Sequence, residues 1–195
     1  MGLSGAAAIA AGVTIWAVQA HSGTDSEAAV PDERETNLLL QTALLQQKYQ
    51  DPQGAVSTYQ RLLRLDPENK LAWYNLGVLA QQKGSTAEAR TAYEKALKID
   101  PDYASALFNE AILLKKSEPD HAAELLRRAI TAQPEAPTAH LQLGLILADK
   151  DRSDDAREEF RRAVASDPSL LSEVPVEFRD SVSPEPNSSQ AGSSE

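Results

Sequence analysis

Apolar residues recur along residues 36–170 with the spacing of amphipathic helices, and the helical stretches come in pairs. In residues 70–103, apolar side chains recur three, four and seven positions apart over residues 73–80, and a second such stretch covers residues 89–97. The polar stretch Lys-Gly-Ser-Thr at residues 83–86 interrupts this pattern, and Asp100-Pro101 ends it, because proline cannot continue a helix. The pattern predicts a helix-turn-helix unit.

The unit occurs four times, with a period of 33 or 34 residues. Four kinds of position keep this period: a proline after the second helix, a large apolar residue and two small residues. They are Pro67, Pro101, Pro134 and Pro168; Tyr59, Tyr93, Leu126 and Phe160; Ala55, Ala89, Ala122 and Ala156; and Ala43, Gly77, Ala111 and Gly144. A single deleted residue between Ala111 and Ala122 accounts for the shorter spacing. Independent residue classes that share one period indicate a repeat architecture.

Small residues stand where the two helices of a unit must approach each other. Gly77 and Ala89 allow this approach, and Ala96 leaves room for the next unit. Trp73 and Tyr93 are large enough to fill the remaining space. A single pair of helices buries too little apolar surface to be stable alone, so we expect the units to stack.

The motif Trp-x2-Leu-Gly, Ala-x3-Tyr-x2-Ala and a final Pro within residues 70–103 resembles the tetratricopeptide repeat family. The resemblance covers residues 36–170 in four units, 36–69, 70–103, 104–136 and 137–170, and we place the repeat domain at residues 32–170. It implies an all-α fold, a right-handed α-solenoid in which the first helices of the units line a concave groove. Such a fold indicates little about the process served, because the family is a scaffold for many partners.

The first unit departs from the family pattern with Thr42 and Gln46 where Leu and Tyr are usual. In the third and fourth units, Glu110 stands where Leu is usual and His140 where Trp is usual. A carboxylate in a core must be paired or solvated. We therefore expect Glu110 to turn toward solvent, or else to reach His140 across the helix interface. Beyond the fourth unit, we expect a short C-terminal cap over residues 171–181 and a disordered, acidic tail rich in Ser and Pro over residues 182–195.

Residues 1–20 carry no charged side chain. As a helix, residues 3–20 would extend about 27 Å, close to the thickness of a bilayer core. We interpret this segment as a transmembrane helix, a single-pass anchor, joined to the repeats by a flexible linker over residues 21–31. A cleaved signal peptide and a buried, Ala-rich helix stay open as alternatives. Arg34 argues for a cytoplasmic repeat domain, whereas analogy with bacterial inner-membrane assembly factors of this layout favours the extracytoplasmic side.

Charge and composition exclude several classes of function. The net charge is −10 and is concentrated in the flanks, so the chain has no broad basic face for nucleic acid. The absence of cysteine excludes thiol nucleophiles, thiolate metal sites and disulfides. The three histidines lack the spacing of metal ligands, and no catalytic motif is found. The sequence therefore predicts a protein that is not an enzyme and needs no cofactor, metal or nucleic acid.

The resemblance assigns fixed positions of each first helix to the groove. The expected lining combines an apolar, partly aromatic stripe with side-chain amides and one pair of lysines: Leu40, Gln41, Leu44, Tyr74, Asn75, Val78, Phe108, Asn109, Ile112, Lys115, Lys116, Leu141, Gln142 and Leu145. An amide both donates and accepts hydrogen bonds, so it can hold the main chain of an extended peptide whatever its sequence. The apolar stripe can hold alternate side chains, or one face of an amphipathic helix.

These observations favour a membrane-anchored interaction module or scaffold that binds a peptide or helix of a partner protein. An assembly or maturation factor is one role of this kind. The alternative is a self-associating scaffold, a homo-oligomer whose groove is filled by another copy or by the chain's own linker. A clamp for acidic C-terminal peptides is not expected, because Lys115 and Lys116 are the sole basic pair among the groove positions.

Overall fold

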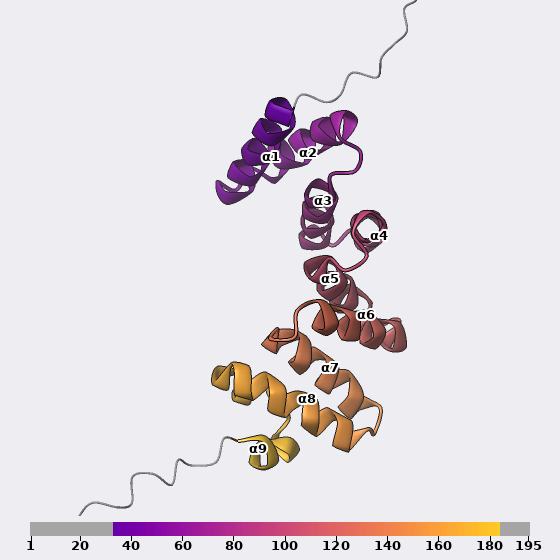
Figure 1. The fold of residues 1–195 in the computed structure, drawn as a ribbon, viewed down its shortest axis with the longest axis vertical. Helices are drawn as coiled ribbons and strands as arrows, with labels where there is room; N and C mark the ends of the chain where they lie inside the picture. The colour runs from indigo at the N-terminus through magenta and orange to yellow at the C-terminus, as the bar shows by residue number, and fades with distance from the viewer. Residues whose placement is uncertain (1–32, 184–195) are drawn as a thin grey trace, which may run out of the picture. The chain divides into compact units, whose positions relative to one another are not determined.

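The computed structural model describes residues 33–183, and in this part of the chain four pairs of helices are followed by a 3-10 helix and one further α-helix (Figure 1). The elements are α1 (Glu33–Lys48), α2 (Pro52–Leu65), α3 (Lys70–Gln82), α4 (Thr86–Ile99), α5 (Ala104–Leu114), α6 (Pro119–Ala132), α7 (Pro137–Asp149), α8 (Ser153–Ser166), the 3-10 helix η1 (Pro168–Glu173) and α9 (Val176–Val182). The second helix of each pair packs on the first helix of the next pair. The predicted all-helical solenoid is thereby confirmed.

Polar caps and prolines determine where several helices begin. The carboxylate of Asp51 accepts a hydrogen bond at 2.9 Å from a backbone N–H in the first turn of α2. The Asn69 side chain accepts one at 3.1 Å in the first turn of α3. Each satisfies a donor that has no partner within its helix. Pro52, Pro119 and Pro137 open α2, α6 and α7, where the missing N–H costs nothing.

The turn inside three of the units contains one residue in the left-handed conformation. Gln50, Gly84 and Asp151 have φ angles of 63°, 80° and 57° and occupy equivalent places in the first, second and fourth units. No left-handed residue lies in the turn of the third unit, residues 115–118. Helix α5 is also shorter, with 11 residues against 13 in both α3 and α7. The one-residue deletion in this unit therefore shortens α5 and removes the left-handed residue.

In the second and fourth units, close packing depends on a small residue of the first helix that faces a ring of the second. A Cβ atom added at Gly77 would lie 2.5 Å from the Tyr93 ring. One added at Gly144 would lie 2.6 Å from the Phe160 ring. Carbon atoms do not approach this closely without a shift of one helix, so glycine at these two positions allows the pairs to close.

The buried tyrosine hydroxyls are satisfied by glutamines of the same pair. In the second unit Tyr93 donates to the side-chain oxygen of Gln81 at 2.7 Å, and the first unit has the equivalent bond. In the fourth unit Phe160 has no hydroxyl, and Ala148 takes the place of the glutamine. A buried hydroxyl without a partner is costly, which explains why the hydroxyl and its acceptor occur together.

The apolar core is divided into two clusters. One joins α1, α2 and α3 around Tyr59, and the other extends from α5 to α9 around Leu107 and Phe160. At the C-terminal end, η1 and α9 cover α8. There the Phe178 ring is buried with its centroid 5.2 Å from that of Phe160, and Val182, expected in the tail, is also buried.

The predicted single-pass membrane localisation, with a transmembrane helix before the repeats, is corrected by this architecture. Among residues 33–183, no helix combines the length and the apolar character that a membrane span requires. The longest of these helices, α1, has 16 residues, whereas a span needs about 20 predominantly apolar ones. The expected anchor and linker, residues 1–31, lie outside the described residues, as does the tail beyond residue 183.

Replacement of Gly77 by alanine tests the close approach of α3 and α4. We expect Gly77→Ala to lower the free energy of unfolding by about 1–3 kcal/mol, because the added methyl group collides with Tyr93. Urea denaturation measures the change. A double-mutant cycle with Tyr93→Leu isolates the collision, since the third unit pairs Ala111 with Leu126 at these positions. If the two changes are additive, the contact does not limit the packing.

Candidate functional site

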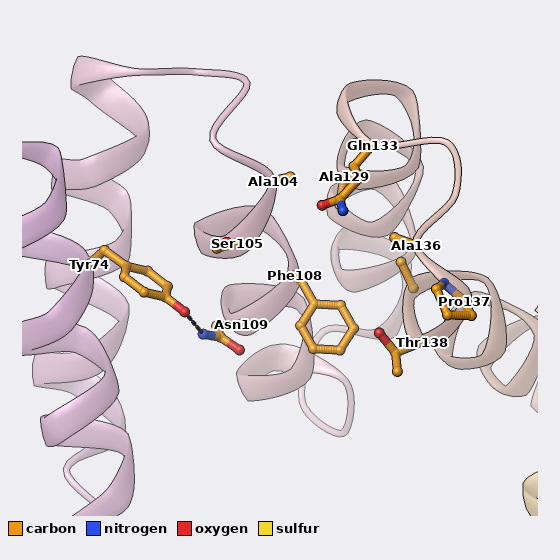
Figure 2. A pocket seen from close by; sticks show the side chains of 11 residues that line it. Tyr74, Ala104, Ser105, Phe108, Asn109, Ala129, Gln133, Ala136, Pro137 and Thr138 are labelled. Carbon is orange, nitrogen blue, oxygen red and sulfur yellow. Dashed lines mark hydrogen bonds between the residues drawn. The ribbon is translucent and has the colours of Figure 1, made fainter. Parts of the chain in front are cut away.

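A cavity of about 260 Å³ lies where α3, α5, α6 and α7 meet, and its walls combine aromatic and small apolar groups with hydroxyls and amides (Figure 2). It is lined by Tyr74, Ala104, Ser105, Phe108, Asn109, Ala129, Gln133, Ala136, Pro137, Thr138 and Ala139. Tyr74 comes from α3, and Phe108 and Asn109 come from α5. The cavity thus joins the first helices of three consecutive units.

Tyr74 and Asn109 form the polar wall of this cavity. The side-chain amide of Asn109 donates a hydrogen bond to the Tyr74 hydroxyl at 3.0 Å, as Figure 2 shows. The Tyr74 ring is held in turn by two other rings, with centroids 6.1 Å away at Tyr93 and 5.2 Å away at Tyr103. The two ring contacts and the hydrogen bond from Asn109 together fix the position of the Tyr74 hydroxyl.

Phe108 forms the apolar wall. Its ring is half-buried and packs against the second core cluster, and Figure 2 shows it between Asn109 and Thr138. The side chain of Gln133 lies at the other side of the cavity (Figure 2). The site therefore offers one aromatic face together with hydrogen-bonding groups of both kinds.

The structure brings Tyr74, Phe108 and Asn109 together, and the other groove residues expected from the sequence lie outside this cavity. Those of intermediate exposure are Leu40, Asn75, Val78, Ile112, Lys115, Gln142 and Leu145; the exposed ones are Gln41, Leu44 and Lys116. Leu141 is buried in the second core cluster, with 1% of its surface exposed. The fourth unit thus presents almost none of this side chain to a ligand.

The amide side chains of the last three units have partners within the chain. Asn75 donates to the backbone oxygen of Leu71 at 2.8 Å. Gln142 accepts a hydrogen bond from Lys115 at 2.9 Å. Asn109 donates to Tyr74, so each of the three amide side chains uses one hydrogen-bonding position within the chain. An amide has several such positions, so each can still bind a second group.

A second cavity, of about 440 Å³, lies where α5 and α7 end, and its lining is basic and acidic at once. Lys115, Lys116 and Lys150 surround it together with Asp149 and the apolar side chain of Ile146. Burial lowers the pKa of Lys115, and Asp149 opposes this effect. Three basic groups and one acidic group thus line this cavity.

Glu110 is buried, with 3% of its surface exposed, so the expectation that it turns toward solvent is wrong. It does not pair with His140 either, because both ring nitrogens of His140 have other partners. Burial, reinforced by the Glu94 carboxylate, raises the pKa of Glu110 to about 7. Arg90 and Arg128 act in the opposite direction. Glu110 is therefore a buried group that can gain or lose a proton near neutral pH.

His140 takes over a structural role that Trp73 has in the second unit. The indole N–H of Trp73 donates to the backbone oxygen of Pro67 at 2.9 Å, and Nε2 of His140 lies 3.0 Å from the backbone oxygen of Pro134. The two pairs are equivalent in the repeat. Since a carbonyl oxygen can only accept, Nε2 carries the hydrogen. The Nδ1 atom lies 2.6 Å from Oε2 of Glu159.

Three polar residues of the main cavity were not named from the sequence: Ser105, Gln133 and Thr138. Ser105 and Thr138 stand at the second position of their units, which the family resemblance already assigns to the groove. Gln133 follows the end of α6, where the sequence carries no comparable signal. Within residues 33–183, no three His, Cys, Asp or Glu side chains are grouped so that they could hold a metal ion.

Comparisons with known proteins agree with the repeat fold. The family model described as Tetratricopeptide repeat matches residues 40–104 and 112–170, which together make up more than half of the chain. No curated protein matches the sequence.

Several solved structures are similar over most of the chain. The MamA protein is 21% identical with a TM-score of 0.66, over 76% of this chain and 86% of that one. MamA from Desulfovibrio magneticus RS-1, from residue 41 onward, is 21% identical with a TM-score of 0.64, over 74% and 81%. YrrB, described as a TPR protein with an unusual peptide-binding site, is 24% identical with a TM-score of 0.64, over 74% and 76%. At these identities the likeness shows the fold alone.

Replacement of Glu110 by glutamine tests its protonation. The pKa of this carboxyl is about 7 in the folded chain against an ordinary value of 4.5, so the folded state holds the proton more tightly. The free energy of unfolding should therefore fall as pH rises from 4.5 through 7 and level off above. We expect Glu110→Gln to remove this fall, which amounts to at most about 3 kcal/mol.

Urea denaturation of both proteins across this pH range measures the difference. Glu88→Gln, at an exposed position of α4, serves as the control and should keep the pH profile of the unmodified chain. If Glu110→Gln has that same profile, the Glu110 carboxyl does not titrate in this range.

Proposed function

Because the chain belongs to the tetratricopeptide repeat family, we propose that it is a protein-interaction module that binds a short peptide segment of a partner in the cavity between α3, α5, α6 and α7. Members of this family bind protein or peptide partners and are generally scaffolds without catalytic activity. The observation that carries the proposal is the meeting of Tyr74, Phe108 and Asn109 in one cavity.

The cavity suits an apolar side chain of the peptide. The half-buried Phe108 ring and the small side chains of Ala129 and Ala136 form an apolar surface, so a large apolar group would lose water on entering. Aromatic or aliphatic anchors of this kind supply most of the binding energy in many interfaces. We infer that one such side chain is the main determinant of affinity.

The polar residues around the cavity suit the main chain of the same peptide. Asn109 has one N–H committed to Tyr74, and its carbonyl oxygen can still accept from a peptide N–H. Gln133 and the hydroxyls of Ser105 and Thr138 add donors and acceptors beside it. Contacts of this kind do not depend on the peptide sequence, so specificity would come from the apolar anchor.

Such a site suits a factor that holds a segment of another protein, for example during its assembly. Charged groups are absent from the cavity lining among the described residues. Neutral walls are compatible with a peptide of either charge, in contrast to a basic clamp for acidic C-termini. YrrB, which shares the fold, is described as having a peptide-binding site, and this adds support to the proposal.

Blocking the cavity tests this function. Random peptides displayed on phage can be selected on the full chain, and the affinity of the strongest binder measured by calorimetry. We expect Ser105→Arg to weaken this binder about tenfold or more, because a long charged side chain at the exposed wall excludes the apolar anchor. Ala165→Arg, at an exposed position of α8, is the matched control and should bind normally.

Removal of the Asn109 side-chain amide is an independent test of where the peptide binds. Asn109→Ala should also weaken the binder, because the main chain of the peptide loses a partner. If both Ser105→Arg and Asn109→Ala bind the selected peptides like the unmodified chain, this cavity is not the binding site.

A further inference from the structure

Two lysines at the C-terminal end of α5 line the second cavity, of about 440 Å³, and take no part in the peptide site described above. Lys115 is half-buried, and its ammonium group donates to the neutral side chain of Gln142 at 2.9 Å. Lys116 is exposed. Neither lysine forms an ion pair within residues 33–183, so both positive charges are available to a ligand.

Two other half-buried basic residues show the arrangement that a partly desolvated charge normally needs. Lys70 is paired with Asp100, and Arg90 is paired with Glu118. Lys115 has lost part of its water without gaining a carboxylate, and burial accordingly lowers its pKa. A carboxylate placed beside Lys115 would therefore be stabilised by more than an exposed lysine offers.

The repeat shows that Lys115 is not needed for the hydrogen bond inside its own helix pair. It stands where Gln47 and Gln81 of the first two units accept the buried tyrosine hydroxyl of the second helix. In the third unit Leu126 replaces this tyrosine and has no hydroxyl. Lys115 instead reaches α7, where Gln142 accepts one of its three N–H groups and leaves two for a ligand.

The two cavities lie toward opposite ends of α5 and α7, and both helices line each of them. Lys115 ends α5 with helical backbone angles, φ −47° and ψ −40°, and follows Phe108 by seven residues. Two helical turns place both side chains on the same face, about 10 Å apart along the axis. An extended peptide advances about 3.3 Å per residue, so about three or four residues cover this distance.

We propose that Lys115 and Lys116 bind an acidic side chain of the peptide, three or four residues away from the apolar side chain that occupies the main cavity. This inference rests on the proposed function and adds a second determinant of specificity to it. The acceptor is a Glu or Asp side chain within the peptide, and the lysines lie at a distance from the neutral walls that hold the anchor.

The charge of the whole chain makes this preference a local one. The net charge is −10, which repels an acidic peptide at long range. In the second cavity Lys150 is already paired with Asp120, so the remaining charges are those of Lys115, Lys116 and Asp149. Two ammonium groups against one carboxylate leave one positive charge in excess. Its attraction acts over a short distance, whereas salt screens the distant charges.

Peptides that bind the main cavity test the proposal by calorimetry on the full chain. Alanine substitution identifies the apolar anchor of the peptide. The residues three and four positions from it, on either side, are then replaced one at a time by Glu and by Gln in peptides with an amidated C-terminus. We expect one Glu peptide to bind about fivefold or more tightly than its Gln counterpart, because a carboxylate makes a stronger hydrogen bond to an ammonium group than a neutral amide does. This comparison needs no change of the protein.

Removal of the two lysines supplies the matching measurement on the protein. The double variant Lys115→Gln with Lys116→Gln should bind the Glu and Gln peptides with equal affinity. Lys83→Gln combined with Lys98→Gln removes the same charge from exposed positions at the end of α3 and on α4, and should keep the preference for Glu. Circular dichroism verifies that both double variants keep their helices.

The outcomes separate this inference from the proposed function. The inference is overturned if no Glu peptide binds more tightly than its Gln counterpart, or if the preference for Glu persists without Lys115 and Lys116. A gain from a free C-terminal carboxylate, with none from Glu, overturns the assignment to a side chain. In these cases the peptide site at the main cavity stands as long as Ser105→Arg weakens the binder. If Ser105→Arg has no effect, the proposed function fails and this inference fails with it.

Discussion

Contact between a small residue on one helix and a ring on its neighbour determines the geometry of this molecule. At Gly77 and Gly144 there is no room for even one more carbon atom against Tyr93 and Phe160. The short distance between paired helices fixes their relative orientation. Contacts between the second helix of one pair and the first helix of the next extend this arrangement along the chain. The cavity at Tyr74 and Phe108 lies between α3 and α5, the first helices of two consecutive pairs.

The sequence was sufficient for the fold because its signals are local and repeated. A proline after the second helix of each unit, small residues at a fixed interval and a large apolar residue at another interval each constrain one helix or one contact. Repetition makes each signal independent evidence for the same unit. In the third unit, the spacing of the repeat revealed the deleted residue, whereas the shortening of α5 was visible in the structure alone.

The candidate site could be predicted in part. The position in the repeat identified Tyr74, Phe108 and Asn109, because the first helix of each unit presents the same face. The position in the repeat could not show that Leu141, which is equivalent to Phe108, is buried in the second core cluster. The burial of Glu110 was missed for a related reason, since it depends on how α4 and α6 pack against α5.

Equivalent positions of the repeat carry different chemistry without a change of backbone. Trp73, Leu107 and His140 occupy one such position, and Leu76, Glu110 and Leu143 occupy another. His140 keeps the hydrogen bond that an indole makes, so a smaller ring with a nitrogen in a similar place is tolerated. Each unit can therefore acquire its own polar groups while the stack is preserved.

The division of the core into two clusters has a consequence for cooperativity. Helix α3 contributes Ala72 and Leu79 to one cluster, and α5 contributes Leu107 and Ala111 to the other. The cavity spans the boundary between them. A molecule seated there would contact α3 and α5 at once, and so would add to the contacts that α4 and the hydrogen bond from Asn109 to Tyr74 already make between the two halves. Occupancy would therefore strengthen the coupling of the two halves during unfolding.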